Sequence, residues 1–161
     1  MLLLFFLYIV FFKVYLLCAT KLQILKLLLI KIQMKNKIKS VHEFHTAFGL
    51  GIKNTPTASI GNAKNLLRFN LMKEENEEYL EAAENNDLVE VADALGDMLY
   101  ILCGTIIEHG MQDKIEAVFN EIQRSNMSKL GNDGTPIFRE DGKVLKGPNY
   151  FKPNITKILE N

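Results

Sequence analysis

The chain has 161 residues, with 19 basic and 19 acidic side chains and a formal net charge of zero. This length fits about one domain that can bury a hydrophobic core. The first 33 residues hold four lysines and no acid, so residues 34–161 carry a net charge of −4. That mild acidity argues against a nucleic-acid-binding module, whose phosphate contacts need a basic surface. Cys18 and Cys103 are isolated and follow no disulfide or zinc spacing.

Residues 1–33 are almost entirely apolar and contain no Gly, Pro, Ser, Asn, Asp, Glu or Arg. We interpret them as upstream sequence read in frame, with Met34 as the true start and a cytoplasmic domain over 34–161. The alternative is a membrane anchor for a cytoplasmic domain, although Lys13 near the centre of the span would cost roughly 2.5–3.5 kcal/mol. A cleaved signal peptide is disfavoured because a basic start and a small-x-small cleavage site are missing.

Beyond residue 34, helical periodicity dominates the sequence. Ser40 and Glu43 form an S-x-x-E capping box, which predicts the start of a short helix. The tail is rich in Gly and Pro, and its "PIFR" and "KVLK" segments flank a Glu-Asp-Gly turn that predicts a small hairpin.

Three longer helices are expected over about 63–84, 88–109 and 112–129. Asp87 is suited to cap the second of these helices, and Gly110 is suited to end it. The expected fold is therefore all-α: a bundle of four main helices around a two-helix acidic hairpin, with a small C-terminal β-hairpin or loop tail.

The acidic residues are concentrated on this hairpin, because residues 71–102 hold ten acids and one base, Lys73. On the first helix, three glutamates share a sector with apolar residues: Glu74, Glu75 and Glu78. The second helix is apolar nearly all round and is expected to be buried on several sides. Its acids occupy one stripe about 60° wide, and they are Glu90, Asp93 and Asp97.

Buried carboxylates without partners cost several kcal/mol each, and one lysine cannot neutralise them all. Mg²⁺ prefers carboxylate oxygens and also binds substrate phosphates. In an antiparallel pair, positions equally far from the connecting turn are level, so Glu75 should face Asp97 and Glu78 should face Asp93. The sequence therefore predicts a Mg²⁺ site, with Mn²⁺ as a substitute, between the two helices.

Four ordered motifs resemble the MazG-like, all-α NTP pyrophosphatases, relatives of phosphoribosyl-ATP pyrophosphohydrolase. The motifs are E-E-x-x-E at Glu74, Glu75 and Glu78, "EVADALGDMLYILCG" (90–104), "RSNMSKLG" (124–131) and "DGKVLKGPNYFKP" (141–153). The resemblance covers about residues 40–155. It implies Mg²⁺-dependent hydrolysis of a nucleoside triphosphate to a monophosphate and pyrophosphate, and a homo-oligomer, dimer or tetramer.

One departure from the family pattern leaves the metal ligands open. The family's E-x-x-D motif places its Asp before an apolar pair and an aromatic, as Asp97 stands before "MLY", but Ala94 occupies the Glu position. The literal E-x-x-D is Glu90 and Asp93. Asp93 lies one turn from Asp97 on the same face and could supply the displaced carboxylate.

The remaining roles follow from the resemblance. It assigns metal binding to the six acids above, and we expect Glu75 or Glu78 to be the general base. Substrate contacts are expected from Asn126, Lys129, Lys143 and Lys146. The rival from another functional class is a membrane-tethered metal- or nucleotide-binding module without turnover. The three histidines complete no Glu-x-x-His pair, which disfavours a di-iron carboxylate bundle.

Removal of residues 1–33 should leave a soluble and active oligomer, because every resembling motif lies beyond them. Light scattering and an activity assay on the shortened chain check this expectation. A stable, active monomer would contradict the oligomer, and detection of peptides from residues 1–33 in membrane fractions would favour the anchor.

Overall fold

The computed structural model describes residues 34–160, so the expectations for residues 1–33 lie outside the described part. The chain divides into two compact units, Met1–Ser40 and Val41–Asn161. Residues 34–47 are helical, and the hydroxyl of Ser40 donates to the carbonyl oxygen of Asn36 at 3.1 Å. The predicted capping box at Ser40 and Glu43 is therefore wrong. Ser40 lies within a helical segment, where a serine hydroxyl bonds the carbonyl one turn back.

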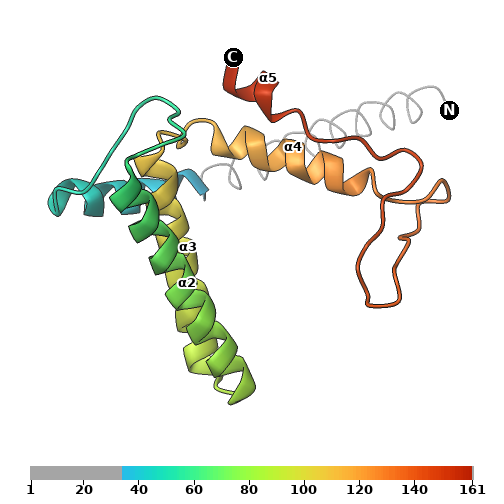
Figure 1. Ribbon diagram of the computed structural model, residues 1–161, viewed down its shortest axis with the longest axis horizontal. Coiled ribbons are helices and arrows are strands. Elements are labelled where there is room, and N and C mark those ends of the chain that lie inside the picture. Colours follow the sequence, from blue (N-terminus) through green and yellow to red (C-terminus); the bar gives the residue numbers. More distant parts are fainter. Residues whose placement is uncertain (1–33, 161) are drawn as a thin grey trace, which may run out of the picture. The chain divides into compact units, whose positions relative to one another are not determined.

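Two long helices form the hairpin: α2 (Asn62–Glu84) and α3 (Leu88–Glu108) lie side by side along their length (Figure 1). The turn between them places Asn86 at a positive φ of 56°. The Asp87 carboxylate then accepts hydrogen bonds from the backbone N–H groups of Val89 at 3.0 Å and Glu90 at 3.2 Å. These bonds satisfy amides that have no partner inside the helix. The predicted cap and the predicted hairpin are both confirmed.

The C-terminal end of α3 is tied to the loop that precedes α2. Gly110 ends the helix with a φ of 68°, and a Cβ at this position would stand 2.1 Å from the carbonyl oxygen of Thr55. The backbone N–H of Lys53 donates to Ile107 at 3.2 Å, and that of Thr57 donates to His109 at 2.9 Å. Gly110 is thus required both for its conformation and for the close approach of the loop.

The C-terminal part contains α4 (Ile115–Met127) and α5 (Ile155–Glu160), which contact each other. Helix α4 begins later than predicted because Met111 and Lys114 form a turn, with Lys114 N–H donating to Met111 at 2.9 Å. The chain that links the two helices is held on α4. There the Ser125 hydroxyl donates to the Phe151 carbonyl at 2.8 Å, and the Arg124 guanidinium lies 4.2 Å from the Phe151 ring centroid.

The predicted hairpin in the tail is present as one antiparallel bridge, between Phe138 and Val144. Arg139 N–H donates to Lys143 at 2.8 Å, and Gly142 closes the turn at a φ of 82°. Beyond this bridge, residues 34–160 form no β-strand, and the all-α fold is confirmed.

Apolar burial is concentrated at the C-terminal part of α3, where Cys103 and Ile107 are 1% and 0% exposed. The expectation that α3 is buried on several sides is not met within one chain. Leu88 and Val89 are 79% and 74% exposed, and Leu95 is also exposed, because α2 covers one side of the helix. Among residues 34–160, no helix is both long and apolar enough to cross a membrane.

Candidate active site

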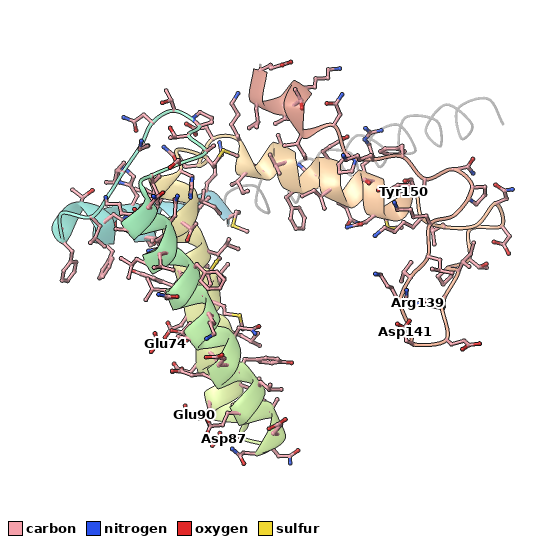
Figure 2. All side chains as sticks on the ribbon, in the orientation of Figure 1. Glu74, Asp87, Glu90, Arg139, Asp141 and Tyr150 are labelled. Carbon is pink, nitrogen blue, oxygen red and sulfur yellow. The ribbon has the colours of Figure 1, made fainter. Side chains whose placement is uncertain are left out.

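The prediction that three α2 glutamates share a covered face is met by Glu75 alone, and the other five predicted metal ligands are exposed. Glu75 is half-buried on the side that also holds Leu71 and the buried Ala82. Glu74 and Glu78 flank it and are exposed; Figure 2 labels Glu74 midway along the hairpin. On the solvated face, Lys73 forms an ion pair with Glu77 at 3.4 Å. Lys73, the one basic residue in 71–102, therefore pairs with Glu77 and not with Glu75.

The α3 acids lie on either side of Ala94, which is 3% exposed. Small buried residues on the two helices, Ala94 and Ala82, permit a close approach of the helix axes. Asp93 and Asp97 stand one position before and three positions after Ala94, and both are exposed. They are four residues apart and therefore lie on one face of α3.

Electrostatic coupling links Glu75 to acids on both helices. Desolvation raises the pKa of Glu75 above its ordinary value, and the negative charges of four carboxylates raise it further: Glu78, Asp97, Glu74 and Asp93. Two of these carboxylates are on α3: Asp97, which the level argument placed opposite Glu75, and Asp93, which it placed opposite Glu78. Like charges at short range disfavour ionisation of a carboxyl group. Five acids therefore form one electrostatic group, here called the Glu75 cluster.

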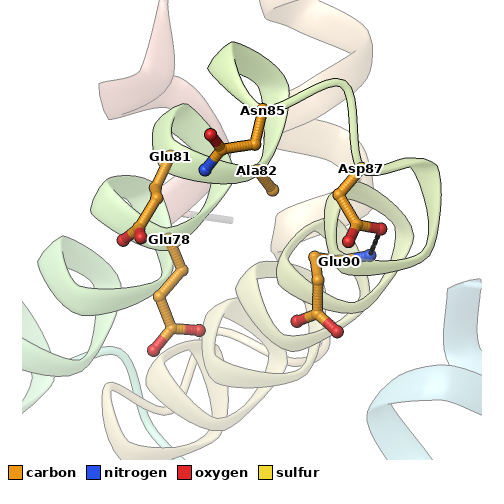
Figure 3. Close-up of a pocket in the computed structure, with 6 residues that line it drawn as sticks. All are labelled: Glu78, Glu81, Ala82, Asn85, Asp87 and Glu90. Carbon is orange, nitrogen blue, oxygen red and sulfur yellow. Dashed lines mark hydrogen bonds between the residues drawn. The ribbon is translucent and has the colours of Figure 1, made fainter.

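Glu90 lies apart from the Glu75 cluster, near the turn of the hairpin. There it lines an open groove of about 340 Å³, shown in Figure 3 together with the other lining residues, Glu78, Glu81, Ala82, Asn85 and Asp87. The carboxylate of Asp87 is engaged in capping α3. Glu78 links this groove to the Glu75 cluster, since it belongs to both.

The donor chemistry of the Glu75 cluster fits a hard divalent cation such as Mg²⁺, because every side chain offers carboxylate oxygens. Across residues 34–160, no three His, Cys, Asp or Glu side chains are close enough together to hold a metal ion as they are placed. The described part of the chain also has no ion pair to Glu75, Asp93 or Asp97. An ion between the helices would supply the missing positive charge and draw the carboxylates inward.

Three of the four residues expected to contact substrate come together where α4 ends. The N–H of Lys129 donates to the Asn126 carbonyl at 3.1 Å, and the Lys129 carbonyl accepts from Gly147 N–H at 2.9 Å. That bond brings Lys146 next to Lys129 along the backbone. The Lys146 ammonium lies 4.4 Å from the ring centroid of Tyr150. Lys143 is on the hairpin turn, where its N–H donates to Asp141 at 3.1 Å.

The sequence reasoning missed a buried polar group between α2 and α3. Arg68 and Glu108 are 8% and 6% exposed, and His45 is 2% exposed. A signal was available, because Arg68 is a cation seven residues before Glu75 and therefore on the same face of α2.

The chain belongs to the phosphoribosyl-ATP pyrophosphohydrolase family, whose model matches residues 41–126, just over half of the sequence. The match contains all six predicted metal ligands and ends at Asn126, so the three lysines lie outside it. The resemblance to MazG-like pyrophosphatases is thereby confirmed at the level of the family.

Among solved structures, the chain is similar to a candidate NTP pyrophosphohydrolase from Exiguobacterium sp. 255-15, determined at 1.78 Å resolution. The two are 28% identical over 78% of this chain and 92% of the other, with a TM-score of 0.41. A TM-score of this size does not show a shared arrangement of the helices. No curated protein matches the chain.

The acids can be tested one at a time with neutral, nearly isosteric changes. Asp93→Asn and Asp97→Asn should each abolish turnover and weaken Mg²⁺ binding, because both carboxylates belong to the Glu75 cluster. Glu90→Gln should leave measurable activity. Thermal stability titrated with Mg²⁺ checks this, since a ligand that binds only the folded state stabilises it. A dead Glu90→Gln variant beside an active Asp97→Asn variant would contradict the assignment.

The raised pKa of Glu75 predicts how the stability of the metal-free protein depends on pH. A carboxyl group whose pKa is higher in the folded state favours folding fully below its unfolded pKa, about 4.3. This contribution is lost as the pH rises through the folded value. In EDTA, the free energy of unfolding from urea melts should therefore fall less steeply over this window for Glu75→Gln than for the unaltered chain. Equal slopes would contradict the electrostatic coupling within the cluster.

Proposed function

We propose that this protein is a Mg²⁺-dependent nucleoside triphosphate pyrophosphohydrolase. It would hydrolyse an NTP or dNTP between the α- and β-phosphates, giving a monophosphate and pyrophosphate. The observation that carries this proposal is membership of the phosphoribosyl-ATP pyrophosphohydrolase family over residues 41–126. The coupling of Glu75 to carboxylates on both helices supports the hairpin as the site.

The Glu75 cluster would hold the metal, with Glu90 at the edge of the site. When bound, Mg²⁺ neutralises the triphosphate, polarises the α-phosphate and lowers the pKa of a bound water. The carboxylates of α2 and α3 would hold the ion between the helices, and their combined negative charge would favour a divalent cation over a monovalent one. Mn²⁺ should substitute, since it accepts the same oxygen ligands.

The proton of the attacking water would pass to a carboxylate oxygen of Glu75 or Glu78. Both glutamates lie on α2 one turn apart, so either can reach a water held between the helices. A general base works best when its pKa lies close to the working pH. Whichever of Glu75 and Glu78 is not bound to the metal would serve in this role.

Asn126, Lys129, Lys143 and Lys146 would contact the substrate. Their amide and ammonium groups suit phosphate oxygens and are poor ligands for Mg²⁺. Lys129 and Lys146 are joined through the backbone at Gly147, which would present two cations together. Lys146 would leave the ring of Tyr150 to reach a phosphate.

The working form would be a homodimer or homotetramer. Leu88, Val89 and Leu95 expose apolar side chains along α3, and burial of apolar surface drives association. A second copy of the chain is the natural cover for a helix face of this kind.

The full-length chain should release pyrophosphate from at least one nucleoside triphosphate, and it should do so only with Mg²⁺ or Mn²⁺. The assay measures pyrophosphate and orthophosphate separately over a panel that includes ribo and deoxy substrates and phosphoribosyl-ATP. Orthophosphate as the first product, or activity that survives EDTA, would contradict the proposal.

A matched pair of variants tests the cluster within the same assay. Glu78→Gln should lower turnover by at least about a hundredfold, the scale expected for loss of a general base or a group that orients one. Glu77→Gln, the adjacent acid on the solvated face, should retain activity. An equal loss of turnover in the two variants would show that activity depends on the total charge of this segment and not on the Glu75 cluster.

A further inference from the structure

Arg68 is a charged residue buried between α2 and α3, toward the end of the hairpin away from the turn. Its side chain is buried, its Nε–H donates to the Thr105 hydroxyl at 3.0 Å, and its Nη2 donates to the Ile101 carbonyl. Both acceptors are on α3. The guanidinium is planar and carries its donors in a fixed fork, so these bonds fix the position of α3 along α2.

A carboxylate from α3 balances the buried charge. Glu108 Oε1 lies 3.7 Å from Arg68 Nη1, and its other oxygen lies 3.8 Å from the ammonium of Lys64. Lys64 and Arg68 are one turn apart on α2, so Glu108 contacts the helix at two successive levels. An isolated buried guanidinium would be costly, and this pairing offsets the cost.

Gly104 provides the space that the guanidinium occupies. A Cβ at this position would stand 2.8 Å from Arg68 Nη2 and 2.8 Å from His45 Nε2. The His45 ring is itself held by a 2.9 Å bond between its Nδ1 and the Gly51 carbonyl oxygen. The Arg68 guanidinium therefore stands at the same height as Gly104 along the helix axes, and the His45 ring also lies next to Gly104.

The alignment of Arg68 on α2 with Gly104 on α3 determines which acids of the two helices stand opposite each other. Seven residues along α2 lead from Arg68 to Glu75, and seven residues back along α3 lead from Gly104 to Asp97. Seven residues are close to two full turns, or about 10.5 Å, and return to nearly the same face. A slip of one turn would shift the acids by about 5.4 Å and separate this pair.

We propose that Arg68, with Thr105 and Glu108, is a positioning group that keeps the α2 and α3 carboxylates at the same level and so forms the divalent cation site. This inference rests on the proposed function, because it concerns the metal site of that reaction. Arg68 bonds to α3 and lies about two turns of α2 away from Glu75. It acts through the packing of the two helices.

Mn²⁺ binding to the full chain tests the proposal without any turnover, with free Mn²⁺ measured by electron paramagnetic resonance. Arg68→Lys retains the charge but cannot reproduce the forked contacts. It should weaken Mn²⁺ affinity roughly tenfold, the lower end of the range for groups that orient metal ligands. Thr105→Val, which removes one acceptor with little change in volume, should weaken it in the same direction. This second variant keeps the test decisive if Arg68→Lys fails to fold.

Ile107→Val is the matched control, because it removes a buried methylene group from α3 and breaks no bond between the helices. All variants are compared at a temperature where each is folded. Unchanged affinity in Arg68→Lys and Thr105→Val, or an equal loss in Ile107→Val, would overturn the positioning role alone. If the unaltered chain binds no Mn²⁺, the proposed function fails as well.

Discussion

The structure depends on packing α2 against α3 while both helices carry carboxylates on the facing side. Desolvation raises the pKa of Glu75, and the charges of neighbouring carboxylates, including Asp97 and Asp93 across the interface, raise it further, so the cluster opposes the pairing that creates it. Contacts at the two ends of the hairpin offset this repulsion. The Asp87 cap lies at the turn, and the buried pair of Arg68 and Glu108 lies at the other end. A bound cation would replace the repulsion among these carboxylates with attraction of each carboxylate to the cation.

Much of the hairpin could be predicted because its signals are local. Helical periodicity and the capping residue Asp87 set the bounds of α2 and α3 closely, and equal distance from the turn put Glu75 level with Asp97. The capping box at Ser40 failed because the motif also fits a serine within a helix, and its hydroxyl bonds to Asn36 instead. A short motif does not determine which of two local hydrogen bonds forms.

The buried contacts of Arg68 with α3 could not be predicted in the same way, since they join segments that are distant in the sequence. Arg68 is an ordinary helix residue in sequence, and its role depends on Thr105, 37 positions later. From the sequence alone, Gly104 is only a residue of low helix propensity within an apolar helix. The structure shows that a Cβ at this position would stand 2.8 Å from the Arg68 guanidinium. The exposure of Leu88 and Val89 was missed for a related reason, because an apolar helix can be covered by another chain.

The central claim is that a divalent cation binds between α2 and α3 at the level of Glu75 and Asp97. Anomalous diffraction from crystals of the protein grown with Mn²⁺ tests it most directly. The account predicts an anomalous peak bounded by carboxylates of both helices, with Asp93 or Asp97 on one side and Glu75 or Glu78 on the other. A peak confined to Glu90 and the groove near the turn, or no peak on the hairpin at saturating Mn²⁺, would contradict it.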